Sequence, residues 1–283
     1  MKIKLDKRNV IIITISILLI TLGIWIYLTN TNITTTKLTI KNEKISKDFN
    51  NYKIVEIADL HNKDWKDKLI SKIEKEKPDI ITITGDFIDS EHTNFEIALE
   101  FTNKAKDIAP IYYVTGNHEA WIDNYEELKK LLIEAGVHVL ENESIFLNKN
   151  NSKINLVGLQ DPDFIEKTNI KGNQDDIINK KLKPLLDSEY YNIVLCHRPE
   201  LFEIYVSLNV DLALTGHAHG GQIRIPFVGG LIAPNQGFFP KYVEGIYHKN
   251  NTDMVVSRGL GNSILPIRIN NTPELVVIEL QNK

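Results

Sequence analysis

The chain has 283 residues, of which 42% are hydrophobic, and this allows one large domain or two small ones with a sizeable core. A single cysteine, Cys196, excludes an internal disulfide framework and a thiolate zinc cluster, so His, Asp or Asn would have to hold any metal ion. The formal net charge is −4, which gives no basic footprint for nucleic acid.

The first predicted element is an uncharged, apolar helix over residues 10–28. At about 1.5 Å per residue it is about 28 Å long, close to the thickness of a bilayer core. Residues 1–9 carry four basic side chains and one acidic one, so the positive-inside rule places them in the cytoplasm and the rest of the chain outside. The high Ile, Lys and Asn content fits an AT-rich bacterial genome, so we expect a single-pass anchor in a bacterial cell membrane.

Two alternatives to this anchor are a cleaved signal peptide and a buried core helix. A signal peptide usually has a shorter apolar region followed by a small-x-small site, and no Ala-x-Ala follows residue 28. Without its basic first nine residues, the exported part is more acidic than the whole chain. Electrostatic binding to DNA or to anionic lipid is therefore disfavoured.

Residues 29–36 are rich in Thr and Asn and are expected to form a polar stalk before one domain over residues 37–283. In that domain strand-like and helix-like runs then alternate, which predicts right-handed crossovers and a largely parallel sheet. The expected strands are 53–58, 79–84 and 111–114, and the expected helices are 66–75, 94–108 and 125–135.

Three strand-like runs then follow without helices, which suggests antiparallel additions to the sheet: 137–140, 144–147 and 154–157. The remaining predicted elements are a helix at 175–186, a strand at 192–196, a helix at 199–208, a strand at 211–214 and a final strand at 274–280.

Residues that can bind divalent cations lie just past the ends of these predicted strands. They are Asp59 and His61, Asp86, Asn117 with His118, His197, and His217 with His219. Five of the eight histidines fall in this set, so it is not a random scatter. In an open α/β sheet, ligands bind at the carboxyl edge of the strands, so we expect these side chains to converge on one site.

Each member of the set has a simpler explanation when it is considered alone. Asp86 after a glycine is a common turn residue, and Asn117 could cap a helix. His217 and His219, flanked by glycines, gain little from packing and are the hardest to explain as structural residues. The histidines outside the set are expected to be ordinary surface or hydrogen-bonded residues: His92, His138 and His248.

Taken together, the motifs resemble the calcineurin-like metallophosphoesterase superfamily over about residues 50–270. Motifs at 158–162, 219–223 and 257–261 resemble its membrane-associated bacterial branch, which includes proteins similar to UDP-2,3-diacylglucosamine pyrophosphatases. The resemblance implies that residues 37–283 form a metallophosphoesterase domain. It also implies an α/β fold, a four-layer α-β-β-α sandwich of two mixed β-sheets flanked by helices; the chain pattern alone does not predict the second sheet.

The resemblance also implies two divalent metal ions, with Mn, Fe, Zn and Mg all compatible with nitrogen and oxygen ligands. One ion would be bound by Asp59, His61 and His219, and the other by Asn117, His197 and His217. Asp86 would bridge the two ions, which would activate a shared water for in-line attack on phosphorus. His118, which is not a ligand, would donate a proton to the leaving oxygen or stabilise the charge there.

The expected substrate is a phosphorylated small molecule or lipid-linked molecule that carries a phosphodiester, phosphomonoester or pyrophosphate. The glycine-rich segment 220–237, with Phe227, Phe238 and Phe239, could form an apolar lip beside the site, and this favours a lipid-linked substrate, although core packing would explain the same aromatics. Arg198 and Arg258 could contact phosphate or serve the structure. A noncatalytic scaffold or receptor and a nuclease are the alternative functions, and the oligomeric state is left open.

Overall fold

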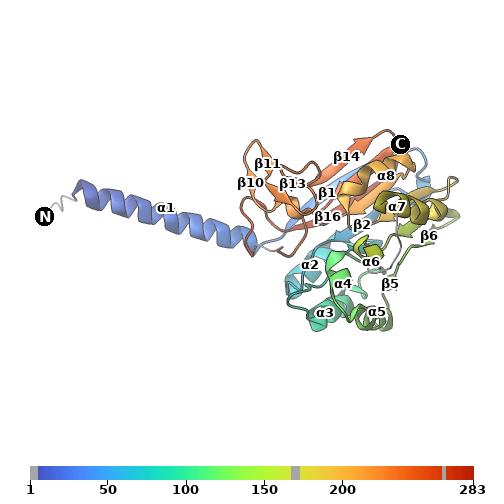
Figure 1. Cartoon of the computed structure of the whole chain (residues 1–283), viewed down its shortest axis with the longest axis horizontal. Coiled ribbons are helices and arrows are strands. Elements are labelled where there is room, and N and C mark those ends of the chain that lie inside the picture. Colours follow the sequence, from blue (N-terminus) through green and yellow to red (C-terminus); the bar gives the residue numbers. More distant parts are fainter. Residues whose placement is uncertain (1–5, 167–172, 263–265) are drawn as a thin grey trace.

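A computed structural model describes residues 6–166, 173–262 and 266–283 (Figure 1). Helix α1 (Lys7–Asn30) projects from the folded domain, and none of its residues is buried. It is long and apolar enough to cross a membrane, and an N-terminal signal sequence has the same properties.

Two six-stranded mixed sheets form the centre of the domain. The order of the first sheet is β1 (Thr34–Asn42), β16 (Glu274–Asn282), β2 (Tyr52–Ile57), β3 (Ile80–Thr84), β4 (Ile111–Val114) and β5 (His138–Val139). The order of the second is β14 (Gly245–Lys249), β15 (Thr252–Val256), β9 (Leu212–Thr215), β8 (Tyr191–Leu195), β7 (Ser152–Gly158) and β6 (Glu143–Lys149). Strands β2 to β5 run parallel to one another, and so do β7, β8, β9 and β15.

Helices cover the outer faces of both sheets. The longer helices are α2 (Asp67–Glu76), α3 (Phe95–Ala105), α5 (Tyr125–Glu134), α7 (Gln174–Leu182) and α8 (Phe202–Ser207). The shorter ones are α4 (Asn117–Trp121) and α6 (Asp163–Glu166), with 3-10 turns at Lys47–Phe49, Lys183–Leu185, Pro199–Leu201 and His219–Gly221.

Three layers of apolar side chains show how the sheets and helices stack. The middle layer joins the two sheets and includes Ile54 and Ile193. An outer layer packs the first sheet against α2, α3 and α5, and the other outer layer packs the second sheet against α7 and α8. Every residue of β3 and β8 is buried, so both faces of these strands are covered, as is usual for parallel strands between two layers. The predicted four-layer α-β-β-α sandwich is confirmed.

Several expected elements differ from those in the structure. Strand β5 pairs with β4 in parallel, so the expected antiparallel addition is wrong there, whereas β6 and β7 are antiparallel as expected. The expected helices at 175–186 and 199–208 each divide into an α-helix and a 3-10 turn that contains a proline, Pro184 in the first and Pro199 in the second.

The stalk expected at residues 29–36 is also corrected by the structure. Helix α1 continues to Asn30 and β1 begins at Thr34, with the buried Ile33 between them. The threonines that were expected to form a linker belong instead to β1, which pairs in parallel with β16 from Thr34 opposite Glu274 onward. Threonine is a good strand residue when a partner strand is available, and that partner lies more than 200 residues away in the sequence.

Two small β-ribbons lie on the side of the domain from which α1 leaves (Figure 1). They are β10 (Arg224–Ile225) with β11 (Gly229–Gly230), and β12 (Ile232–Ala233) with β13 (Gly237–Phe238). The end of α1 is fastened nearby, where the Asn30 side chain donates to the carbonyl of Arg268 and accepts from its backbone N–H.

Candidate metal centre

The predicted site residues come from the ends of five strands in the two sheets. Asp59 and His61 follow β2, Asp86 follows β3, and Asn117 and His118 begin α4 after β4. In the second sheet, His197 follows β8, and His217 and His219 follow β9. The structure brings all eight side chains to one edge of the sandwich, where the middle apolar layer ends.

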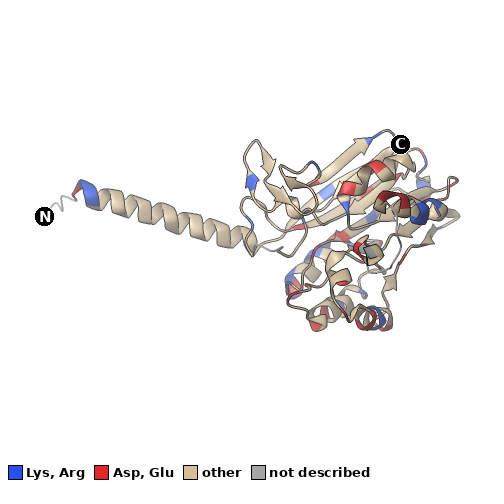
Figure 2. Cartoon of the chain, in the orientation of Figure 1, with Lys and Arg blue, Asp and Glu red and all other residues tan. Residues whose placement is uncertain are grey.

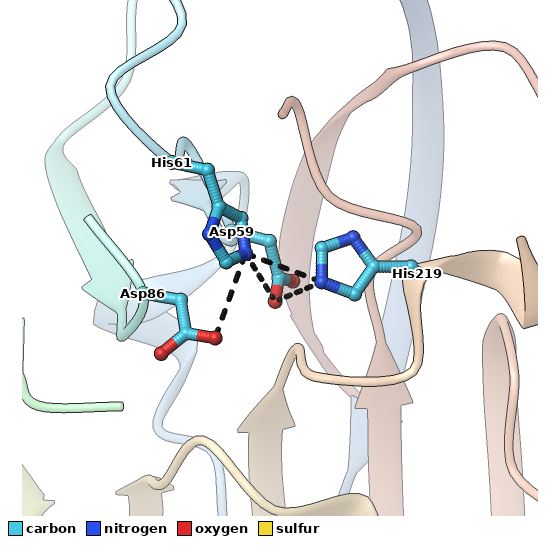
Figure 3. A group of neighbouring side chains, drawn as sticks. All are labelled: Asp59, His61, Asp86 and His219. Carbon is cyan, nitrogen blue, oxygen red and sulfur yellow. Dashed lines mark hydrogen bonds and ion pairs between the residues drawn. The ribbon is translucent and has the colours of Figure 1, made fainter. Parts of the chain in front are cut away.

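One group of ligand atoms surrounds the Nε2 atom of His61 (Figure 3). This nitrogen lies 3.2 Å from His219 Nε2, 3.5 Å from Asp86 Oδ2 and 3.9 Å from Asp59 Oδ1. His219 Nε2 is 3.4 Å from the same Asp59 oxygen. Four nitrogen and oxygen ligands in this cluster are compatible with a divalent cation.

A second group lies beside the first and shares Asp86. His197 Nε2 is 3.1 Å from Asp86 Oδ2 and 3.1 Å from His217 Nδ1. The buried Oδ1 atom of Asn117 receives no hydrogen bond from any described residue. A buried carbonyl oxygen without a donor carries a cost of about 1–3 kcal/mol, which a cation would remove. The residues present therefore fit a divalent metal ion.

The other ring nitrogen of three histidines is directed at an oxygen. His197 Nδ1 donates to the backbone oxygen of Thr84 at 2.8 Å. Asn235 Oδ1 accepts from His217 Nε2 at 3.0 Å, and Asp89 Oδ2 lies 3.6 Å from His61 Nδ1. The hydrogen bonds of His197 and His217 hold a proton on the outer nitrogen and leave the inner one as a lone-pair donor, which is the arrangement that metal-binding histidines use. The Asp89 carboxylate lies beyond hydrogen-bond distance of His61 Nδ1 but faces it.

The charges of the site favour a cation as well. Burial lowers the pKa of both His217 and His219 well below 6.5, so these imidazoles stay neutral and keep their lone pairs. Burial also raises the pKa of Asp59 to about 6. Burial opposes protonation of His197, but Asp86 and Asp59 outweigh it and raise its pKa to about 10. The negative field that holds a proton here would equally hold a metal ion.

Glu119 is a buried carboxylate that the sequence motif contained but to which it gave no role. It accepts hydrogen bonds from the backbone N–H groups of Gly116, Asp86, Phe87 and Ile88 at 2.6–3.1 Å. It thereby fixes the loops after β3 and β4 against each other.

Gly85 sits where these two loops touch, with a φ of 90°. A Cβ there would lie 2.6 Å from the Gly116 nitrogen and 2.7 Å from His197 Nδ1, so only glycine fits.

His118 faces the site without joining either group around Asp86. Its Nδ1 accepts from the backbone N–H of Ser90 at 3.0 Å, so the neutral ring carries its proton on Nε2. That Nε2 lies 4.0 Å from Asp86 Oδ2, toward the cluster. Burial lowers the pKa of His118 below 6.5.

An open cavity of about 860 Å³ lies over the cluster. Its wall includes His61, Asp86, Asn117, His118, His217 and His219, together with Lys63, Trp121, Pro234, Asn235, Asn262 and Pro266. Asp59 and His197 lie beneath this surface and are fully buried. A small phosphorylated group can therefore reach the cluster from outside.

Arg198 and Arg258 are both engaged with carboxylates. Arg198 is buried and makes two bonds to Asp161, at 2.7 and 2.8 Å, and it lies 3.2 Å from His217 Nε2. Arg258 bridges Glu244 and Glu274. Neither arginine lines the cavity.

The remaining expectations concern residues outside the cluster. His92 is exposed at the cavity rim, His138 stacks on Tyr112, and His248 pairs with Asp253 on the surface. Phe227, Phe238 and Phe239 are exposed, so core packing does not explain them, and they do not line the cavity.

The sequence did not single out Asp89, Asn235 or Arg268, which contact the histidines of the site. Among the described residues Arg268 is the largest fully buried side chain, and its guanidinium lies 3.3 Å from His219 Nδ1. Only Asp89 had a sequence signal, because it follows Asp86 by three residues in the same loop.

This α/β sandwich, with a histidine and carboxylate cluster at its strand ends, defines a metal-dependent hydrolase class, and comparison with known proteins identifies the family. The calcineurin-like phosphoesterase family model matches residues 52–221, and the chain belongs to this family. The chain is a metallophosphoesterase by descent, and the family together with the residue groups described above suggests a divalent metal site.

Its relatives include the uncharacterized metallophosphoesterase YkuE of Bacillus subtilis, 33% identical over 90% of this chain and 88% of that protein. The phosphodiesterase YaeI of Escherichia coli is 29% identical over 81% of this chain and 82% of its own length. Among solved structures, the chain is similar to the phosphopantetheinyl hydrolase of Mycobacterium tuberculosis, with 13% identity, a TM-score of 0.44, and coverage of 72% of this chain and 87% of that one.

Proposed function

We propose that the protein hydrolyses a phosphoester or pyrophosphate bond with two divalent cations held at the edge of the sandwich. The observation that carries this proposal is the pair of ligand groups that share Asp86. Asp59, His61 and His219 would complete one group, and Asn117, His197 and His217 the other. A single cation would not account for both groups.

The cations, when bound, would supply a water of lowered pKa as nucleophile and neutralise charge on the phosphoryl oxygens. The chain itself orients the ligands through Thr84, Asn235 and Asp89, as described above. His118 presents an Nε2 proton to the cavity while its ring is neutral, because the Ser90 N–H occupies Nδ1. The neutral ring would donate a hydrogen bond from Nε2 to the departing oxygen and stabilise the charge there, whereas full protonation of that oxygen would require the imidazolium form of His118.

Hydrolysis of a bis-aryl phosphodiester by the purified, detergent-solubilised full chain with added Mn²⁺ tests this proposal. We expect Asp86→Ala and Asn117→Ala to abolish turnover, and metal analysis of the unaltered protein to give about two ions per chain. His248→Ala, which alters an exposed histidine on β14, is the matched control and should keep full activity. Full activity of Asp86→Ala would refute the assignment, and metal binding without turnover of any phosphoester would indicate a scaffold.

We infer that α1 remains attached as a membrane anchor, with its N-terminus in the cytoplasm and the catalytic domain outside. The absence of buried residues along α1 supports this placement, as does the two-way hydrogen bonding between Asn30 and Arg268. Resistance of the protein to alkaline extraction, together with an intact mass that includes residues 10–28, is the expected result. A mature chain that lacks these residues would show a cleaved signal peptide instead.

We further propose a lipid-linked phosphoester or pyrophosphate as the substrate, because the cavity wall includes Lys63, Asn262 and Pro266, close to the end of α1. A phosphate held at the surface of the membrane would then lie near the cluster. Faster turnover of lipid-bearing than of lipid-free esters by the reconstituted protein would support this substrate. Equal turnover would argue against it.

A further inference from the structure

The most exposed apolar side chains of the described folded domain lie in the two β-ribbons. Phe227 is fully exposed, and Phe238, Phe239 and Val228 are 70%, 64% and 59% exposed. Ile225 and Ile232 in the same segment, and the neighbouring Ile267, are also exposed. We call these seven residues the ribbon patch. Exposed apolar side chains that are gathered in one segment, and not scattered singly, indicate an interaction site.

The backbone of the ribbons makes the aromatic residues harder to explain by chance. Phe227 has a φ of 68° and Phe239 a φ of 54°. A bulky residue in this left-handed region is strained, and a turn with these angles favours glycine or asparagine. Phe227 lies in the turn of the first ribbon and Phe239 in the bend after β13, and phenylalanine at both positions in spite of this preference indicates that the exposed rings have a role of their own.

The charge of the segment points to an apolar partner. Residues 223–240 contain one charged side chain, Arg224, and no acidic residue. Arg224 is itself neutralised, because it pairs with Glu244 and donates to the Gly220 carbonyl. Figure 2 shows the ribbons as almost uniformly uncharged, in contrast to the helices on the opposite side of the domain. No unpaired charge in these ribbons would oppose their entry into an apolar medium.

A short series of hydrogen bonds links the ribbons to the end of α1. Asn30 pairs with the backbone of Arg268. The adjacent Ile269 forms a bridge with Ile223, and its carbonyl accepts from the N–H of Arg224 in β10. The ribbons are therefore joined through Arg268 and Ile269 to the end of the apolar helix, and they lie on the same side of the domain as that end (Figure 1).

We propose that the ribbon patch inserts into the outer leaflet of the bilayer that α1 crosses. A segment of this kind enters the boundary between head groups and acyl chains by about 5–10 Å. The patch and α1 together hold the domain at two points, which fixes its rotation about the α1 axis. This proposal rests on the retention of α1 and is independent of the proposed chemistry.

Depth-dependent quenching on the full chain in phosphatidylcholine proteoliposomes tests this placement. Cys196 is buried, and burial raises the pKa of its thiol to about 12, so an introduced cysteine can be labelled selectively with an environment-sensitive fluorophore. The labelled positions are Phe227→Cys and Phe238→Cys in the patch and Phe146→Cys, an exposed aromatic on β6, as the matched control. Leu19→Cys in α1 reports whether the helix is inserted.

We expect lipids with a nitroxide near the head group to quench positions 227 and 238 and to leave position 146 unchanged, while lipids with a deeper nitroxide quench position 19. Quenching at 227 and 238 no greater than at 146 would overturn the proposal. A blue-shifted emission that no lipid quenches would mean that protein covers the patch, such as a second copy of the chain, and would also overturn it. If position 19 is unquenched, the anchor and the patch placement both fail. Hydrolysis of a soluble ester, measured on the same samples, shows that each variant is folded. The result of this activity assay bears on the proposed chemistry and not on the placement of the ribbon patch.

Discussion

The buried ion pair between Asp161 and Arg198 supports both the fold and the second ligand group. Its two bonds, 2.7 and 2.8 Å long, join a fully buried carboxylate to a guanidinium that is 4% exposed. Arg198 directly follows His197 in the chain and lies 3.2 Å from His217 Nε2. Asp161→Ala should therefore destabilise the domain and disturb the histidines at the same time.

The expected loss in the free energy of unfolding is about 3–5 kcal/mol, because the change leaves a buried guanidinium without its main partner. Asp163, 2.8 Å from Arg198 Nη2, retains part of the pairing and moves the expectation to the lower end of that range. A domain of this kind has a total stability of about 5–15 kcal/mol, so the variant should still fold.

Urea unfolding of the detergent-solubilised full chain measures the loss, with an unchanged m-value showing that the same surface is exposed. Asp163→Ala is the matched control and should cost less, since Asp163 is partly exposed and Asp161 remains. Replacing both partners, Asp161→Leu with Arg198→Met, should restore most of the stability. A loss below about 1 kcal/mol for Asp161→Ala, the usual value of a surface pair, would refute the reasoning.

Three further changes test the site. Asn235→Ala removes the hydrogen-bond acceptor that orients the His217 ring. Competition with a chelator should show a metal affinity that is about 10–100-fold weaker, with an unchanged urea midpoint. An unaltered metal affinity would contradict the assigned orientation of His217. His118→Ala should lower kcat by about 10²–10⁴ for alkyl esters and much less for nitrophenyl esters, at full metal content; equal losses for both would exclude the proton-donor role. Burial lowers the pKa of His118 below 6.5, so activity that needs the imidazolium should decline as the pH rises through a value under 6.5. Activity that needs only the neutral Nε2–H group should persist to higher pH. The pH profile of kcat decides between these two forms of His118. Gly85→Ala should reduce both stability and metal content, because its Cβ would overlap His197, and a variant with normal metal content would show that the loops can separate.

The positions of the candidate ligand residues along the chain were predictable, because each of them directly follows a strand that its own local sequence indicates. Asp86 follows a run of isoleucines and threonines that ends in a glycine, and such an uncharged, β-branched run indicates a buried strand. The same logic placed His197 after β8 and His217 after β9. Parallel strands bring their carboxyl ends together, so convergence at one edge followed from the strand order.

The hydrogen-bond partners of the site were not predictable in the same way. Asn235 lies 18 residues from His217 in an irregular ribbon, and the partner in β3 is a backbone carbonyl, Thr84, which no residue pattern encodes. The second sheet came from the family resemblance, because strand periodicity does not say which strands share a sheet. The stalk was wrong for a related reason, since the partner strand of β1 is distant in the sequence.

The position of β16 between β1 and β2 in the first sheet has a consequence for biogenesis. This strand, at residues 274–282, lies between β1 and β2, and it pairs with β1 from Thr34 opposite Glu274 to Asn42 opposite Asn282. Asp59 and His61 follow β2, so their loop stands on a strand whose neighbour is synthesised more than 200 residues later. If α1 is held in the membrane as proposed, the chain beyond it must cross almost completely before the sheet can close. The metal centre would then form only on the far side of the membrane, and metal ions on the synthetic side would meet an unfinished set of ligands.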